Sequence, residues 1–466
     1  MTDLQTDLSA VGARAARVLP ELLERHDVPA AALGILLGDE VFTTSAGVLN
    51  LGTGVEATDD SVFQIGSITK VWTATLVLQL VDEGLVDLDA PVRTYLPGLR
   101  LADDEAAAAM TVRQLLSHTA GFEGDIFTDT GRGDDAIEKL VATFDDVPQL
   151  FEPGALFSYN NAGYCVLGRL VEVLREKPYD EVLAERLFTP LGLTHAAAGP
   201  YDAIRFRVAM GHVDKEGGGQ EPAPFWALAH SNGPAGAHLA MSAADLLAFA
   251  RMHLDDGQAP DGTQVLSPAS VTAMQGAQVS LPDLRVMGTS WGLGWELFEN
   301  AAEPMVGHDG NTVGQASFLR VVPGRRLAVT LLTNGGQPYD VFHELVGDVL
   351  RELAGVELTP LPTPPESPEP VGDASPYVGT YGNRVLHVVV SQDDDGRVWS
   401  ELQPQGATPD PSSEAQRIEL VPLGPDVLVP LEPVQGLHIP HAFVGREADG
   451  PARWLHIGRA MPRLTE

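Results

Sequence analysis

The stretch Phe63-Gln64-Ile65-Gly66-Ser67-Ile68-Thr69-Lys70 decides how the rest of the chain is interpreted, because it places a serine three residues before a lysine. The apolar run that follows predicts a helix from Ser67 to a C-cap near Gly84. Residues three apart on a helix share a face, so we expect the hydroxyl of Ser67 and the amine of Lys70 within hydrogen-bonding reach. The chain has only 4 lysines beside 25 arginines. A buried lysine can lose its proton, whereas an arginine cannot.

Ser67 and Lys70 are therefore a candidate nucleophile and base. A serine hydroxyl is a weak nucleophile until a neighbouring group removes its proton. A lysine can do so when burial or nearby cations destabilise its ammonium form. A helix N-terminus also presents backbone N–H groups to a developing oxyanion. A helix-capping serine and a surface lysine would give the same short pattern, so this motif alone does not establish catalysis.

Two further motifs lie far downstream. Tyr159 and Asn161 form a Tyr-x-Asn motif, and His308 and Gly310 form a His-x-Gly motif. Taken singly, the tyrosine would be interpreted as a core aromatic and the histidine as a hydrogen-bonded loop residue. The combination with Ser67 and Lys70 makes both of these interpretations improbable.

In this order, the three motifs resemble those of the serine β-lactamase and penicillin-binding-protein superfamily, whose class A members carry Ser-x-x-Lys, Ser-Asp-Asn and Lys-Thr-Gly. Their forms here are similar to the branch that holds class C-like esterases, D-amino-acid peptidases and penicillin-binding-protein-type thioesterases. The stretches Leu115–Gly121, Pro153-Gly154 and Ala235–Leu239 also resemble this family. The resemblance covers roughly residues 12–355. His118 and His238, within these stretches, are interpreted as structural.

The resemblance implies a catalytic role for four residues. Ser67 would attack a carbonyl and become acylated, and Lys70 would take its proton, either directly or shared with Tyr159. The Tyr159 phenol would then pass a proton to the leaving group. This requires positive charge nearby to lower the phenol pKa from about 10. We expect Lys70 and His308 to supply that charge.

The resemblance also implies binding roles. The backbone N–H groups of Ser67 and Asn311 would form the oxyanion hole. Asn161 would hold Lys70 and the substrate amide, and Gly310 is a further predicted substrate-binding residue. The third motif departs from the family because His308 replaces a lysine, a permanent cation that β-lactamases use to bind a substrate carboxylate. Histidine is largely neutral near pH 7, which argues against efficient β-lactam hydrolysis.

The expected fold class is α+β: an antiparallel sheet flanked by helices, plus an all-helical subdomain, followed by a small C-terminal β-barrel. Hairpins are predicted for Ala30–Leu37 with Val41–Val48, and for Gln315–Val322 with Leu327–Thr333. Strands at both ends of this region indicate one sheet completed by distant parts of the chain. Between Gly84 and about Ser290 the pattern is mainly helical. Two further helices are expected, one over residues 8–22 and one at Tyr339–Leu353.

The predicted domains are residues 1–358, a proline-rich linker at 359–372, and a β-domain at 373–466. Six prolines in residues 359–370 predict an extended linker. The β-domain has short strands divided by turns such as Asp393–Gly396 and 409–411. Ser375–Tyr381 resembles the opening of the lipocalin-like domain appended to hydrolases of this branch. In that setting Arg459 or Arg463 would reach over the serine cleft to bind a peptide carboxylate.

Composition excludes several classes of partner. The net charge is −35, from 29 basic and 64 acidic residues, and such a field repels nucleic acid and anionic membranes. No run approaches the ~20 apolar residues of a membrane span. Cys165 is the single cysteine, so no internal disulfide is expected. The start of the chain does not resemble a signal peptide, and we expect a cytoplasmic protein. No metal-ligand spacing occurs, and no cofactor is expected.

The sequence therefore predicts a serine acyl-transfer enzyme with a covalent acyl-Ser67 intermediate. Its substrates would be small molecules or peptides, as amides, esters or thioesters, with D-configured or non-standard residues, released by water or by an amine. One alternative is a stand-alone thioesterase that cyclises nonribosomal peptides head to tail, and another is a β-lactamase. An alternative of another class is a non-catalytic sensor or scaffold. The sequence does not indicate the oligomeric state.

Overall fold

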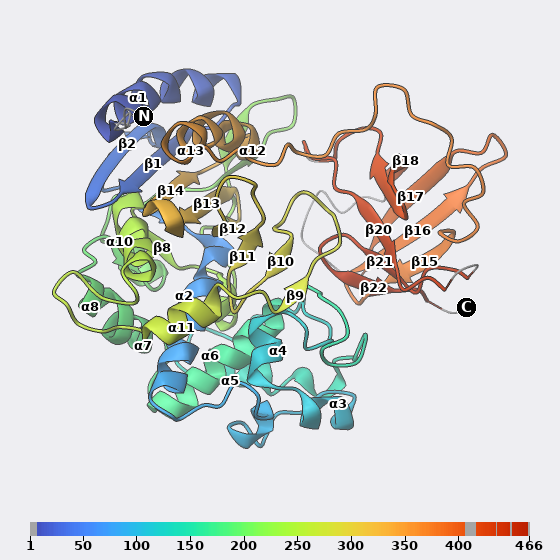
Figure 1. Cartoon of the computed structure of the whole chain (residues 1–466), viewed down its shortest axis with the longest axis horizontal. Coiled ribbons are helices and arrows are strands. Elements are labelled where there is room, and N and C mark those ends of the chain that lie inside the picture. Colours follow the sequence, from blue (N-terminus) through green and yellow to red (C-terminus); the bar gives the residue numbers. More distant parts are fainter. Residues whose placement is uncertain (1–6, 406–415, 435, 448–449, 465–466) are drawn as a thin grey trace.

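Two large sheets organise the chain, which a computed structural model describes for residues 7–405, 416–434, 436–447 and 450–464 (Figure 1). The first sheet has nine strands in the order β3-β2-β1-β14-β13-β12-β11-β10-β9, and each neighbouring pair is antiparallel. Its strands are β1 (Ala30–Leu37), β2 (Glu40–Asn50), β3 (Val55–Glu56), β9 (Val279–Ser280), β10 (Ser290–Trp291), β11 (Glu296–Phe298), β12 (Met305–Thr312), β13 (Gln315–Val322) and β14 (Leu327–Thr333). The first and last thirds of this region therefore share one sheet.

Successive strand residues point to opposite faces of this sheet, and both faces carry apolar side chains. Helices therefore cover both faces. Leu33 and Ile35 of β1 pack with α1 (Leu8–Arg25) and α13 (Gly347–Ala354). On the opposite face, Ala32 and Leu36 belong to a second core, which includes residues of α2 (Thr69–Asp82) and α10 (Ala243–Leu254). Buried residues lie all round α2 from Thr69 to Leu80, as expected for a central helix.

A helical region lies beyond α2, at the bottom of Figure 1. Its helices are α3 (Asp104–Ala109), α4 (Val112–Leu116), α5 (Ala136–Val141), α6 (Asn161–Arg175) and α7 (Tyr179–Leu183). The remaining short helices are α8 (Thr189–Leu191), α9 (Pro200–Ala203), α11 (Pro268–Met274) and α12 (Pro338–Val341). Two small sheets complete this part of the chain. One has three strands in the order β4-β8-β5, and the other pairs β6 with β7. These strands are β4 (Phe63–Gln64), β5 (Ala196–Ala197), β6 (His212–Asp214), β7 (Gln220–Pro222) and β8 (Ala240–Met241).

The second large sheet has eight strands in sequence order and forms a nearly closed barrel at the C-terminal end (Figure 1). Its strands are β15 (Gly379–Gly382), β16 (Leu386–Gln392), β17 (Val398–Pro404), β18 (Gln416–Gly424), β19 (Val427–Pro430), β20 (His441–Val444), β21 (Trp454–His456) and β22 (Ala460–Pro462). An isolated bridge between Tyr381 and Arg463 brings the first strand to the last. The barrel has its own apolar core, which includes Tyr381, Phe443 and Leu455.

The predicted α+β class with a C-terminal barrel is confirmed. The two predicted hairpins occur, and α1 begins at the expected residue. The expected helix at Tyr339–Leu353 is divided into α12, a π-helical turn at Phe342–Val346, and α13. The expectation of a mainly helical pattern as far as residue 290 overlooked short strands such as β9. The domain boundaries stay a prediction, and the predicted turn at 409–411 lies outside the described residues. Among the described residues, no helix has both the length and the apolarity needed to cross a bilayer.

Candidate active site

Ser67 lies in a short 3-10 turn, Gly66–Ile68, that leads directly into α2. The Lys70 amine donates to the Ser67 Oγ at 3.0 Å and to the carbonyl oxygen of Ala235 at 2.6 Å. Gly66 has φ +51°, and a Cβ there would lie 2.5 Å from the backbone nitrogen of Asn311. Only glycine permits this close approach, which brings strand β12 against the serine turn.

Burial gives Lys70 the character of a base. Its side chain is 0% exposed, and this burial lowers the pKa of Lys70 from 10.5 to about 7. The neutral amine, which can accept a proton, is therefore accessible near pH 7. The sequence motif indicated the spacing, and the structure adds the burial that makes the amine titratable.

Tyr159 lies beside this pair. The Lys70 amine is 4.7 Å from the centre of the Tyr159 ring, and the guanidinium of Arg459 is 5.0 Å from it. Burial raises the pKa of the Tyr159 phenol well above its usual value, although the Ser67 side chain and the charge of Arg459 act in the opposite direction. The phenol is protonated at neutral pH, and the expected lowering of its pKa is wrong because desolvation outweighs the nearby charge.

His308 is the residue of the third motif and lies on β12, with its ring 6.3 Å from that of Tyr159. Its Nδ1 donates to the carbonyl oxygen of Asp309 at 2.6 Å, so in the neutral ring Nε2 is the acceptor. Burial lowers the pKa of His308 to about 3. Our expectation that His308 supplies positive charge is therefore wrong. The cation that acts on Tyr159 in its place is Arg459.

A carboxyl group behind His308 does not reverse this conclusion. Glu296 lies 3.7 Å from the His308 Nδ1 and is 4% exposed. Burial, together with the nearby Asp309 carboxylate, raises the pKa of Glu296, which favours its neutral form and weakens its ability to stabilise an imidazolium. The nearby carboxylate of Asp309 is instead paired with the buried guanidinium of Arg320, at 2.5 Å.

Asn161 is the first residue of α6, and the side chain of Asn160 caps that helix by accepting from the backbone N–H of Gly163. The Asn161 amide donates to Asp125 Oδ1 at 2.9 Å. Our expectation that Asn161 holds Lys70 has no counterpart among the described hydrogen bonds, where Ala235 takes that place.

Asp125 also binds Arg459, whose Nε lies 2.6 Å from Asp125 Oδ2. Arg459 comes from the barrel, in the turn between β21 and β22, so this carboxylate joins the two parts of the chain. Asp125 carries no motif, and its partners Asn161 and Arg459 are far away in the sequence. For that reason sequence reasoning missed it.

The turn that carries Arg459 also bonds to the backbone of the Tyr-x-Asn motif. The imidazole Nε2 of His456 donates to the carbonyl of Phe157 at 2.9 Å, and the N–H of Tyr159 donates to the carbonyl of Gly458 at 3.2 Å. The N–H of Ala460 donates to the Ser158 hydroxyl at 3.1 Å. Arg463 instead bonds within the barrel, to Val378, Ala452 and Tyr381.

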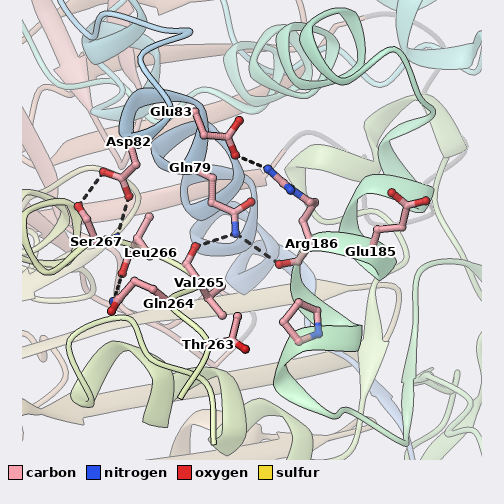
Figure 2. Close-up of a pocket in the computed structure, with 11 residues that line it drawn as sticks. Gln79, Asp82, Glu83, Glu185, Arg186, Thr263, Gln264, Val265, Leu266 and Ser267 are labelled. Atoms are coloured by element: carbon pink, nitrogen blue, oxygen red, sulfur yellow. Dashed lines mark hydrogen bonds and ion pairs between the residues drawn. The ribbon is translucent and has the colours of Figure 1, made fainter. Parts of the chain in front are cut away.

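A separate pocket lies at the C-terminal end of α2 (Figure 2). It has a volume of about 330 Å³ and includes Gln79, Asp82 and Glu83 in its lining. Asp82 lies twelve positions after Lys70 along α2, a rise of about 18 Å. This pocket is therefore separate from the cluster around Ser67.

Comparison with known proteins agrees with this geometry. The chain matches the family described as Beta-lactamase over residues 15–349. It belongs to that family of serine acyl-transfer hydrolases. It is 49% identical to Penicillin-binding protein 4 of Amycolatopsis lactamdurans over 363 residues, which cover 77% of this chain and 94% of that protein. The predicted family is thereby confirmed.

Solved structures extend the similarity to the barrel. The crystal structure of SurE is 31% identical, with a TM-score of 0.76, and the match covers 98% of this chain and 99% of that one. The D-amino acid amidase of Ochrobactrum anthropi SV3 is 23% identical, with a TM-score of 0.62, and covers 74% of this chain and 99% of its own. The amidase match covers about three quarters of this chain, whereas the SurE match covers nearly all of it, including the barrel.

Proposed function

We propose that the chain is a serine acyl-transfer enzyme in which Ser67 forms a covalent acyl intermediate. The observation that carries this proposal is the 3.0 Å contact between the Ser67 hydroxyl and a buried Lys70 amine whose pKa is about 7. A serine paired with a neutral amine has the base that it needs close to physiological pH. A helix-capping serine next to a solvated lysine would not require this burial.

In the acylation step, the neutral Lys70 amine accepts the Ser67 proton while Oγ bonds to the substrate carbonyl carbon. The carbonyl oxygen becomes an oxyanion, which the backbone N–H groups of Ser67 and Asn311 would stabilise. The close approach of Gly66 to the Asn311 nitrogen supports this placement. The carbon–leaving-group bond then breaks, and the leaving group takes a proton.

Tyr159 is the proposed donor of that proton. Its phenol is protonated at neutral pH, because burial raises its pKa, and the Lys70 ammonium lies 4.7 Å from its ring. The phenol can pass its proton to the leaving group and regain one from Lys70, so no free phenolate has to accumulate. Neutral His308 can accept a hydrogen bond through Nε2 and help to orient the phenol or the substrate.

The acyl donor that we propose is a peptide-like amide, ester or thioester with a D-configured residue at the reacting carbonyl. Support comes from SurE, which was also solved with D-Leu; that structure is 30% identical and has a TM-score of 0.76. Asn161 and Gly310 would bind the peptide backbone. Arg459 would bind a substrate carboxylate, for which it must exchange part of its contact with Asp125.

Two peptidyl thioesters that differ only in the configuration of the C-terminal leucine test this proposal. We expect turnover of the D-leucyl thioester at least about tenfold faster than that of the L-leucyl thioester, which corresponds to 1.4 kcal/mol of discrimination. The Ser67→Ala variant should turn over neither. Equal rates for the two thioesters would contradict the D-preference, and activity in Ser67→Ala would contradict the nucleophile.

The product masses identify the acceptor. Water gives the free acid, whereas attack by the peptide's own amino group gives a cyclic product that is lighter by one water, as expected for a head-to-tail cyclising thioesterase. A chromogenic cephalosporin tests the β-lactamase alternative. The sensor alternative predicts that Ser67 stays unacylated with every substrate.

A further inference from the structure

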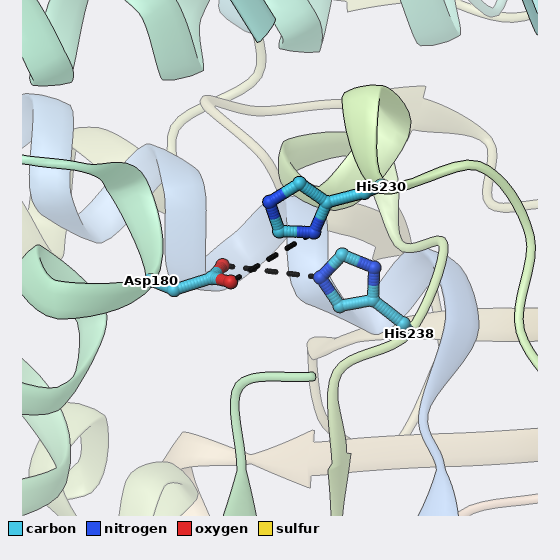
Figure 3. Close-up of side chains that lie close together, drawn as sticks. All are labelled: Asp180, His230 and His238. Atoms are coloured by element: carbon cyan, nitrogen blue, oxygen red, sulfur yellow. Dashed lines mark ion pairs between the residues drawn. The ribbon is translucent and has the colours of Figure 1, made fainter. Parts of the chain in front are cut away.

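Asp180, His230 and His238 form a second cluster of titratable side chains (Figure 3). Asp180 lies in α7, His230 begins the turn His230–Ala235, and His238 follows that turn. One carboxylate oxygen and one nitrogen from each imidazole lie within 4.8 Å of one another. No pair of these residues has the sequence spacing that is typical of metal ligands, so the sequence did not reveal the cluster.

Each imidazole has a nitrogen near the Asp180 carboxylate, and the two rings are stacked with their centres 5.1 Å apart. The His230 Nδ1 lies 4.0 Å from Asp180 Oδ2, and the His238 Nε2 lies 3.8 Å from Asp180 Oδ1. Both distances exceed the length of a hydrogen bond. Zinc bonds of 2.0–2.1 Å in tetrahedral geometry place neighbouring ligand atoms about 3.3 Å apart. The two Asp180 contacts are longer than this by about half an ångström, so the side chains would have to move together for the three groups to hold one ion.

We propose that Asp180, His230 and His238 bind a zinc ion. Two imidazole nitrogens and one carboxylate oxygen are a donor set that zinc prefers over magnesium or calcium. The His238 side chain is 2% exposed, whereas those of His230 and Asp180 are 26% and 31% exposed and leave room for water as a further ligand.

The electrostatic surroundings support a cation at this position. The carboxylate of Asp180 lies 4.0 Å from the His230 Nδ1 and 3.8 Å from the His238 Nε2. The carboxylates of Asp129 and Asp134 are also close enough to act on His230. With Asp180, they place three carboxylates around His230.

The ion would stabilise the turn His230–Ala235, whose last carbonyl binds Lys70, the base of the proposed active site. Ala235 closes this turn, and its carbonyl accepts the hydrogen bond from Lys70 at 2.6 Å. Gly236 packs so tightly on the serine turn that a Cβ there would lie 2.3 Å from the carbonyl oxygen of Gly66. The zinc site is structural, and its existence does not depend on the proposed acyl transfer.

Zinc titration of the chelator-stripped full chain tests this inference, with a chromophoric chelator as competitor. We expect one zinc ion per chain, and more than a 100-fold loss of affinity in His230→Asn and in Asp180→Asn, because removal of a second-shell partner alone costs 10–100-fold. The matched control is His387→Asn, in the barrel, which should bind as tightly as the wild type. Circular dichroism with EDTA shows whether each variant is folded.

Two results would overturn the site. One is wild-type binding no tighter than that of the folded Asp180→Asn variant, and the other is an equal loss in His387→Asn. If both cluster variants unfold, cobalt on the wild-type chain decides the question. Visible bands of four-coordinate cobalt with nitrogen ligands would support the site, and the spectrum of hydrated cobalt would refute it.

Discussion

Replacement of Lys70 by methionine should remove the pH dependence that the buried amine gives to the free energy of unfolding. The pKa of Lys70 is about 7 in the folded chain, against 10.5 as its ordinary value. Between these values the unfolded chain binds one more proton than the folded chain, so the free energy of unfolding rises with pH. The slope approaches 1.4 kcal/mol per pH unit, and the rise from pH 7 to pH 9 is about 2 kcal/mol. This contribution is complete above pH 10.5 and is lost as the pH falls through 7.

Urea unfolding at pH 7 and pH 9 measures the effect. The free energy of unfolding of Lys70→Met, relative to the wild type, should fall by about 2 kcal/mol between the two pH values, because methionine does not titrate. Loss of the hydrogen bonds to Ser67 and Ala235 shifts both values equally and cancels. Replacement of the exposed Lys215 by methionine is the control and should give no such change. A difference for Lys70→Met that does not depend on pH would refute the lowered pKa.

Three further results are expected. Lys70→Arg should abolish turnover although it keeps the charge, because arginine cannot act as the base; near-normal steady-state rates would exclude this role. Asp125→Asn should reduce turnover about 10- to 100-fold, since charged hydrogen bonds to Arg459 and Asn161 contribute about 1.5–3 kcal/mol; an unchanged rate would show that this carboxylate positions nothing. Deletion of residues 372–466 should impair even small activated esters, because the barrel turn bonds to the backbone of the Tyr-x-Asn motif. Full ester activity in the truncated chain would contradict that dependence.

Local patterns in the sequence predicted much of the fold. Strand β1 is a run of eight apolar residues, most residues of β14 are apolar, and the turns of both hairpins carry glycine. Strands β9, β10 and β11 are only two or three residues long, too short to show a period, and could not be found in this way. Strand β11 pairs with β12, β10 with β11, and β9 with β10, so their positions depend on tertiary pairing.

For the candidate site, the sequence predicted which residues come together but not their charge states. The spacing of Ser67 and Lys70 follows from helix geometry alone, and the motif order indicated that Tyr159 and His308 join them. Charge states could not be predicted, because they depend on burial. The neutral His308 and the protonated phenol follow from the packing around them, and Arg459 acts on the phenol only because the barrel docks there.

The rate at which a fluorophosphonate modifies the chain, measured against pH by intact mass spectrometry, tests the central claim most directly. We predict one adduct per chain, located on Ser67, with a rate that rises as the pH increases through about 7, following deprotonation of Lys70. No adduct, an adduct on another residue, or a rate on Ser67 that does not change between pH 5 and pH 9 would contradict the account.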